Sequence, residues 1–268
     1  MAEGDSLVRI ARKLEPAMSG RVLVAASAPN PRSTLRQHAR RLEGRLVERI
    51  ETRGKHLLIH LDDGLSLHSH LGMNGGWRVD DGRGFGKPDR IAWLLLEMGG
   101  DAGEGSGASL RVGQFGGTTL RLVRTVELDR DPRLARLGPD ILAPDLDLER
   151  AASRLVASPD EVGVALLDQT VVCGIGNIFK SEACFEAGIH PWRPAPSLAG
   201  EGSGESEAAR LLGIARRQMQ DAVETGRRPG RIYKKTGRPC FCCRAPGIRS
   251  RAQGDDARTT YWCPNCQS

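Results

Sequence analysis

Two closely spaced cysteine pairs near the C-terminus constrain this sequence more than any other feature. Each pair has two residues between its cysteines, and nineteen residues separate the pairs: Cys240 and Cys243, then Cys263 and Cys266. This spacing falls in the window of roughly 15–20 residues that is typical of four-cysteine zinc sites, and four thiolates close a tetrahedral structural shell. Cys242 is too close to Cys240 for both to bind one ion in this way. The sequence therefore predicts one structural Zn²⁺, with reduced, unliganded cysteines as the alternative.

The residues around the cysteines predict a basic β-hairpin. Residues 225–254 contain nine Lys or Arg and no Asp or Glu, which favours a polyphosphate-binding surface, with a solvated basic tail as the alternative. The segment 258–262 is rich in Thr, Tyr and Trp, residues that favour strands. The segment is too short for a hydrophobic core of its own, so we expect the metal to supply its folding energy. We expect a metal-bound hairpin that presents Arg258.

Length and charge favour a globular protein with more than one domain. The chain has 268 residues and a net charge of +6, and roughly 150 residues per domain suggests about two domains. The sequence contains no run of ~18 apolar residues, so we expect no membrane span. Two acids within the first five residues and no apolar stretch argue against a secretory signal, so we expect a cytoplasmic protein with reduced thiols.

The hydrophobic pattern changes along the chain and predicts an α+β protein of several domains. Apolar residues at helical spacing predict a first helix over residues 7–18. Short strands and turn signals then favour a β-sandwich or barrel. The expected strands are Val22–Val24, Leu57–Leu61, Leu65–His70, Ile91–Leu96 and Leu120–Val126. After residue 131 the pattern is helical, with stripes at 148–155, 164–167, 177–187 and 211–222. The predicted domains are 1–128, 129–228 and 229–268.

The turn before the third of these helices is a candidate DNA-binding element. Gly174 and Gly176 carry no side chains that would block close approach to the turn, and helix N-terminal amides suit a phosphate. Asn177 adds a side-chain donor, and Lys180 adds a charge one turn later. An ordinary helix start with Asn177 as its N-cap is the alternative.

The chain as a whole resembles the formamidopyrimidine/endonuclease VIII family of DNA glycosylases. The residues that carry the resemblance are Glu3-Gly4-Asp5, Arg53-Gly54-Lys55-His56-Leu57-Leu58, Ser69-His70-Leu71-Gly72-Met73, Leu137-Gly138-Pro139-Asp140, Gly174-Ile175-Gly176-Asn177-Ile178, and the cysteine segment from Thr236 to Pro264. Tyr261 and Trp262 before Cys263 favour the endonuclease VIII branch, in a bacterial protein. The resemblance implies an N-terminal helix and β-sandwich, a helical domain with a helix–two-turn–helix, and a C-terminal zinc-finger hairpin.

The resemblance also implies the chemistry of the N-terminus. In this family the N-terminal amine displaces the damaged base, forms a Schiff base with the sugar and nicks the strand by elimination. The usual residue at this position is proline, whereas this chain has Ala2, which gives a primary amine once Met1 is removed. An α-amine has a pKa of about 7.7–8.0, so part of it is neutral at physiological pH. Glu3 matches the family's general acid/base.

Other matched positions imply contacts with DNA. Lys55 matches a sheet lysine that approaches the lesion's phosphate and assists elimination. Arg258 matches the zinc-finger arginine that binds phosphates beside the flipped nucleotide, and Asn177 binds the same backbone. Met73 matches a residue that fills the gap left by the flipped base, with core packing as the alternative. The four histidines of the sheet are interpreted as hydrogen-bonded structural residues: His56, His60, His68 and His70.

The implied function is a bifunctional DNA glycosylase and abasic-site lyase of base excision repair. Its partner would be damaged DNA and its only cofactor one structural Zn²⁺; we expect a monomer with no membrane association. Residues 130–137 show no clear match to the other gap-filling residues of the purine-specific branch, which favours oxidised pyrimidines. The alternative is a family member that binds damaged or abasic DNA but has lost its chemistry through Ala2. A zinc module attached to an unrelated fold would not explain motifs spread over both halves.

Overall fold

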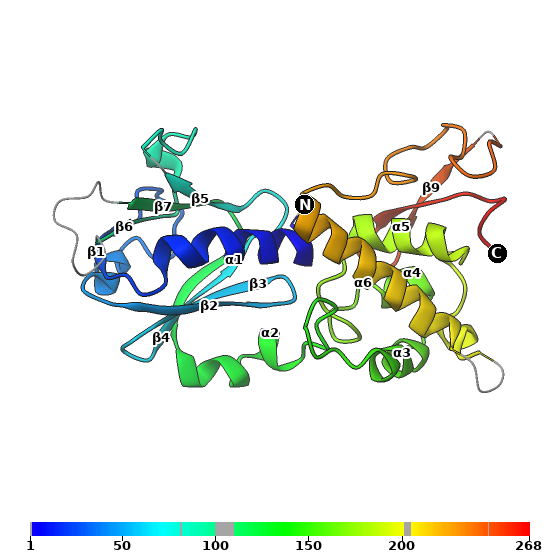
Figure 1. The fold of residues 1–268 in the computed structure, drawn as a ribbon, viewed down its shortest axis with the longest axis horizontal. Helices are drawn as coiled ribbons and strands as arrows, with labels where there is room; N and C mark the ends of the chain where they lie inside the picture. The colour runs from blue at the N-terminus through cyan, green and yellow to red at the C-terminus, as the bar shows by residue number, and fades with distance from the viewer. Residues whose placement is uncertain (1, 81, 100–109, 201–204, 246) are drawn as a thin grey trace. The chain divides into compact units, whose positions relative to one another are not determined.

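The computed structural model describes residues 2–80, 82–99, 110–200, 205–245 and 247–268, and within them it forms two compact units (Figure 1). The first unit contains Ala2 and Ser6–Ala135, and the second contains Glu3–Asp5 and Arg136–Ser268. The cysteine segment belongs to the same unit as the helices, and the three-domain division stays a prediction. No helix in the described ranges is both long and apolar enough to span a bilayer.

The first unit is a β-sandwich with a leading helix, as predicted. One antiparallel sheet has the order β1-β6-β7-β5 and the other the order β2-β3-β4-β8. The helix is α1 (Gly4–Met18), and the strands are β1 (Leu23–Ser27), β2 (Val47–Arg53), β3 (His56–Leu61), β4 (Leu65–His70), β5 (Gly76–Asp80), β6 (Leu94–Met98), β7 (Leu110–Phe115) and β8 (Thr119–Arg124). Short helices η1 (Ala39–Leu42), η2 (Asp89–Ile91), η3 (Thr125–Arg130) and α2 (Pro132–Ala135) connect or follow them.

Side-chain alternation along the strands explains this core. On β3, Leu57, Ile59 and Leu61 point into the buried cluster, whereas His56 and His60 lie on the other face because successive side chains alternate. Apolar residues of α1, such as Leu7 and Leu14, complete the same cluster. The sandwich therefore buries one face of each sheet and leaves a polar face on the β2-β3-β4-β8 sheet.

The second unit is helical and ends in a β-hairpin, as predicted. Its elements are α3 (Leu148–Val156), α4 (Val162–Ala165), α5 (Asn177–Ala187), η4 (Ala195–Leu198), α6 (Glu207–Thr225), β9 (Arg249–Gln253) and β10 (Arg258–Trp262). Asp147 and Ser206 cap α3 and α6 through their side chains. Gly188 and Gly226 end α5 and α6 in the left-handed conformation. Helix α5 packs between α6 and β10 in this unit, so it is the element that joins the helices to the hairpin.

Candidate functional site

The N-terminus of α5 holds the carboxylate of Glu3. This side chain is fully buried; its Oε1 accepts the backbone N–H of Ile178 at 2.9 Å and its Oε2 accepts that of Phe179 at 3.4 Å. The positive end of the helix dipole favours an anion at this place. The expectation that this turn leaves its amides open to a DNA phosphate is therefore wrong for these two amides, because the protein's own carboxylate occupies them.

Close approach of Glu3 explains why residue 176 is glycine. A Cβ on Gly176 would lie 2.3 Å from Cδ and 2.7 Å from Oε1 of Glu3. Gly174 adopts a φ of +100°, and its carbonyl accepts the N–H of Gly4 at 2.9 Å. Both glycines therefore serve the binding of the N-terminal segment, a role that their spacing alone did not reveal.

Asp5 forms a second anchor that the sequence did not predict. Its buried carboxylate accepts hydrogen bonds from Nε (2.8 Å) and Nη2 (2.6 Å) of Arg228, the two-pronged geometry that suits a guanidinium. Burial works to lower the pKa of Arg228, but the bonds to Asp5 outweigh it and raise that pKa. Glu3 and Asp5 together fix the residues that follow Ala2.

In the first unit, Ala2 lies beside the loop that carries Met73. The backbone nitrogen of Ala2 donates to the carbonyl of Gly72 at 3.4 Å, and Gly72 has a φ of +59°. The Met73 side chain is 62% exposed, so the alternative that it packs in the core is wrong. Lys55 sits at the turn between β2 and β3, and its charge contributes, after burial, to lowering the pKa of His70. The structure thus groups Ala2, Lys55 and Met73 around one end of β4.

Two side chains of α5 support the hairpin strand that begins at Arg258. Asn177 donates from Nδ2 to the carbonyl of Thr259 at 2.8 Å. The N-cap of α5 is Gly176, and Asn177 is the first residue of the helix. The ammonium of Lys180 is fully buried and donates to Oγ1 of Thr260. Burial lowers the pKa of Lys180 to about 8, although the charges of Cys184 and Glu3 act to raise it.

These contacts change the role expected for the two α5 residues. A direct phosphate contact from Lys180 is not available in this arrangement, because the amine is enclosed and bonded to the hairpin. Asn177 is also buried, and its Oδ1 has no hydrogen-bond partner among the described residues. The Arg258 side chain is 42% exposed and forms a long ion pair, 3.8 Å, with Asp256. Of these three residues, Arg258 is the one that can reach an external phosphate.

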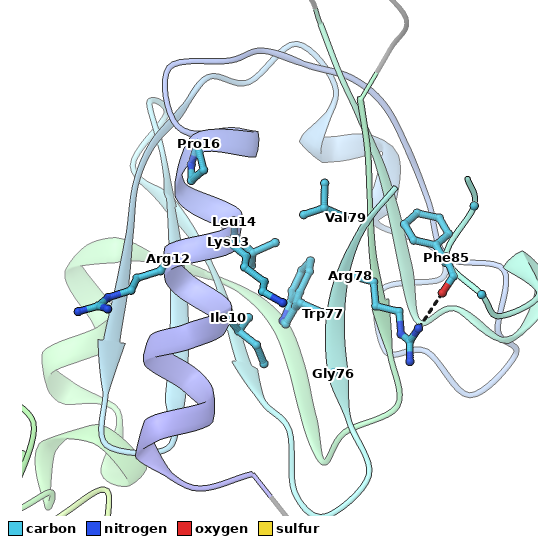
Figure 2. Close-up of a pocket in the computed structure, with 12 residues that line it drawn as sticks. Ile10, Arg12, Lys13, Leu14, Pro16, Gly76, Trp77, Arg78, Val79 and Phe85 are labelled. Carbon is cyan, nitrogen blue, oxygen red and sulfur yellow. Dashed lines mark hydrogen bonds between the residues drawn. The ribbon is translucent and has the colours of Figure 1, made fainter. Parts of the chain in front are cut away.

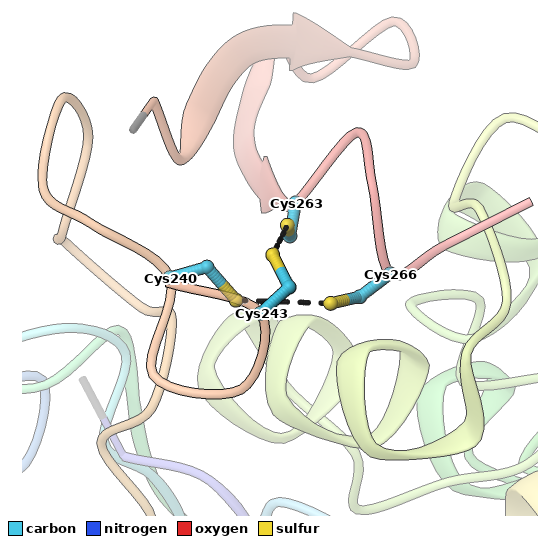
Figure 3. Close-up of side chains that lie close together, drawn as sticks. All are labelled: Cys240, Cys243, Cys263 and Cys266. Atoms are coloured by element: carbon cyan, nitrogen blue, oxygen red, sulfur yellow. Dashed lines mark hydrogen bonds between the residues drawn. The ribbon is translucent and has the colours of Figure 1, made fainter. Parts of the chain in front are cut away.

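The four predicted cysteines converge on one point (Figure 3). Cys240 Sγ lies 3.8 Å from Cys266 Sγ, and Cys243 Sγ lies 3.7 Å from Cys263 Sγ. A tetrahedral ion with metal–sulfur bonds of ~2.3 Å requires sulfur–sulfur distances of about 3.8 Å. Two of the sulfur–sulfur distances match this value and all four sulfurs lie within 4.8 Å of one another, so the four side chains can hold one metal ion, and Cys242 is not among them.

The histidines of the sheet are hydrogen-bonded, as predicted. His56 Nδ1 and His68 Nε2 are 2.8 Å apart, His60 contacts Ser66, and His70 contacts Thr118. Burial lowers the pKa of His56 to about 3 and that of His68 to about 4. The imidazoles of His56 and His68 are therefore neutral at physiological pH, and all four histidines belong to the polar face of the sheet.

Comparison with known proteins identifies the family. The model of the formamidopyrimidine-DNA glycosylase N-terminal domain matches residues 1–104, and that of the formamidopyrimidine-DNA glycosylase H2TH domain matches residues 137–233. The chain belongs to the formamidopyrimidine-DNA glycosylase family.

Relatives and solved structures agree over the full length. The chain is 37% identical to the "Probable endonuclease 8 2" of Streptomyces coelicolor, over all of this chain and 94% of that protein. It is 35% identical to endonuclease 8 2 of Mycobacterium tuberculosis and 34% identical to a formamidopyrimidine-DNA glycosylase of Cereibacter sphaeroides, over the whole of each chain. A structure of the Lactococcus lactis enzyme bound to abasic-site DNA matches all of both chains, with a TM-score of 0.81 and 25% identity.

Proposed function

We propose that this chain is a bifunctional DNA glycosylase and abasic-site lyase of base excision repair. Family membership gives the reaction class. The observation that carries the proposal is the anchored carboxylate of Glu3, buried at the α5 N-terminus one residue after Ala2. Because consecutive Cα atoms are 3.8 Å apart, anchoring Glu3 restricts where the amine of Ala2 can lie. A fixed nucleophile beside a fixed carboxylate is what this chemistry needs.

The α-amine of Ala2, freed by removal of Met1, is the proposed nucleophile. It attacks C1′ of the damaged nucleotide, so that an N–C1′ bond forms as the bond to the base breaks and the base leaves with a proton. Opening of the C1′–O4′ bond then gives a Schiff base. Loss of a C2′ proton expels the 3′-phosphate and nicks the strand. The Glu3 carboxylate accepts a proton from the attacking amine and passes it to O4′ as the ring opens.

The other site residues act on the DNA backbone and the base stack in this proposal. Lys55 approaches the phosphate of the lesion and assists elimination, and Arg258 binds flanking phosphates through its planar guanidinium. Asn177 and Lys180 position the Arg258 strand from inside the protein. Met73, an exposed and unbranched side chain, enters the gap left by the flipped nucleotide.

We propose Zn²⁺ as the ion for the four-cysteine site, because four thiolates at tetrahedral spacing suit zinc in a closed structural site. The ion would fix the ends of the hairpin that carries Arg258 and take no part in bond making. We further propose oxidised pyrimidines as the preferred lesions, a monomer as the active form and the cytoplasm as its location.

Strand cleavage of defined oligonucleotides tests this function. Duplexes with an abasic site, a thymine glycol or an 8-oxoguanine should be nicked, with the thymine glycol duplex cleaved faster than the 8-oxoguanine duplex. Glu3→Gln should reduce base removal by a factor of about 10²–10⁴, the usual contribution of a general acid or base. Arg36→Gln, on an exposed side chain outside the site, is the matched control. Intact abasic-site DNA after incubation with correctly processed protein would contradict the lyase proposal.

The alternative function is recognition of damaged or abasic DNA without catalysis, and Ala2 in place of the family's proline is the observation that favours it. Ala2→Pro separates the two functions. A similar rate before and after the substitution supports the enzyme, whereas cleavage by the proline variant alone identifies the native chain as a binding protein.

A further inference from the structure

A groove of about 1020 Å³ in the first unit lies between α1 and β5 (Figure 2). Helix α1 contributes Ile10, Lys13 and Leu14 to its wall, and β5 contributes the four consecutive residues 76–79. Figure 2 shows the Lys13 side chain extending from α1 toward the side of the groove formed by Trp77. None of the residues assigned above to catalysis, DNA or metal binding lines this groove.

The groove runs along an edge of the sheet. Successive side chains of a strand point to opposite faces, so four consecutive lining residues mean that the groove follows the strand edge rather than one face. β5 stands last in the order β1-β6-β7-β5, and no residue of its neighbour β7 lines the groove. An uncovered edge offers backbone N–H and C=O groups to an added strand.

The charge of the groove selects the kind of strand that would fit. Arg12, Lys13 and Arg78 line it, and none of its lining residues in the described part of the chain is an Asp or Glu. Arg12 points away from β5 in Figure 2, so Lys13 and Arg78 are the cations nearest to an added strand. Three acids are close by in sequence: Glu15 is exposed on α1, Asp80 is buried and hydrogen-bonded to Arg111, and Asp81 lies outside the described residues.

The far side of the groove is held in place by its own hydrogen bonds. Asp80 Oδ1 accepts the N–H groups of Gly82 (3.0 Å) and Gly84 (2.6 Å), and Arg78 Nη1 donates to the carbonyl of Phe85 at 2.8 Å. These bonds hold Gly82, Gly84 and Phe85 against β5, so a bound peptide would not have to order these residues.

We propose that this groove binds an acidic, extended segment of a partner protein, which adds as a strand to the edge of β5. Its acidic side chains lie on the face of Arg78, and its alternate apolar side chains lie on the face of Trp77, beside Ile10 and the aliphatic stem of Lys13. Apolar lining and a bare strand edge favour a peptide over DNA, whose binding would rest on cations alone. Partner binding here is separate from the repair reaction proposed above.

Fluorescence polarisation with a labelled peptide of alternating Asp and Val, about six to eight residues long, tests the proposal on the full chain. Replacing every Asp by Asn should weaken binding about tenfold, and so should the Lys13→Glu/Arg78→Glu double variant. Arg36→Glu, an exposed arginine of the same unit, is the matched control and should bind as the native chain does. Abasic-site cleavage by the double variant should stay unchanged, which verifies its fold.

Backbone methylation tests the strand geometry without changing the protein. Two peptides are made, with N-methyl groups on the odd or on the even residues; only one set of amides can face β5, so one peptide should lose binding and the other keep it. Equal behaviour of the two, or equal binding of the Asn peptide, would overturn the proposal. Displacement of the peptide by single-stranded DNA, or self-association of the chain that the double variant abolishes, would also overturn it.

Discussion

Gly176→Ala tests the Glu3 anchor with the smallest possible change. The new Cβ would lie 2.3 Å from Glu3 Cδ, far inside contact distance, while φ at this position is −124° and imposes no backbone strain on alanine. The Glu3 carboxylate must therefore move. The movement gives up a 2.9 Å bond from Ile178 and a longer 3.4 Å bond from Phe179.

The expected loss in the free energy of unfolding follows from the number and kind of these hydrogen bonds. A hydrogen bond to a charged group contributes about 1.5–3 kcal/mol, and one good bond with one long bond gives a loss of roughly 2–4 kcal/mol. Urea unfolding should show this loss, and single-turnover cleavage of abasic-site DNA should slow by about 10² or more as the acid/base group leaves its place.

Gly213→Ala is the matched control for this experiment. Gly213 lies inside α6, and its new Cβ would meet nothing closer than Leu148 Cδ2 at 3.7 Å. Alanine should stabilise this helix by up to about 1 kcal/mol and leave cleavage unchanged. Native stability and native cleavage in Gly176→Ala would refute the claim that Glu3 needs the space above this glycine.

Three further predictions concern the Asp5 anchor, the four-cysteine site and the histidines of the sheet. Asp5→Asn leaves the half-buried guanidinium of Arg228 without its counter-charge. The substitution should lower the free energy of unfolding by about 3 kcal/mol; an unchanged urea midpoint would argue against the anchor. Cys266→Ser should abolish stoichiometric zinc, measured by elemental analysis, whereas Cys242→Ser should retain it; loss of zinc in both would show that the wrong set was chosen. His56 and His68 have folded pKa values of about 3 and about 4, below the unfolded value of 6.5, so they are neutral in the native state and the unfolded chain binds more protons. The contribution of these two histidines to the free energy of unfolding should be fully present above pH 6.5 and should decrease as the pH drops toward 4 and then 3. A His56→Phe/His68→Leu variant whose stability depends on acid pH as the native chain's does would contradict this assignment.

Features set by local sequence were predictable, and the cysteine hairpin is the best example. The spacing of Cys240, Cys243, Cys263 and Cys266 indicates the metal site, and the β-branched and aromatic run after Arg258 forms the expected strand. The helix start at residue 177 and its end at Gly188 also follow local signals.

Strand β2 was not predicted because its sequence, Val-Glu-Arg-Ile-Glu-Thr-Arg, is mostly charged. Its outward residues serve the polar sheet face; Glu51, for example, bonds to His60 on β3. Burial on one face and hydrogen bonding on the other form this strand, and hydrophobic periodicity does not report the second effect.

The anchors of the N-terminus could not be read from the sequence because each joins residues far apart in the chain. Glu3 meets Ile178 across 175 residues, and Asp5 meets Arg228 across 223. Lys180 looked like a surface cation because its partner, Thr260, lies 80 residues away. Spacing shows which residue types are present, whereas the fold decides whether a cation faces solvent or supports another strand.

The central claim is that the amine of Ala2 makes the covalent bond to the sugar. Borohydride reduction during reaction with abasic-site DNA traps a Schiff base, and mass spectrometry of the digested adduct locates the attached sugar. The account predicts a mature chain that begins at Ala2 and an adduct on its α-amine. An adduct on a lysine side chain, or a mature chain that retains Met1 and still forms the adduct, would contradict it.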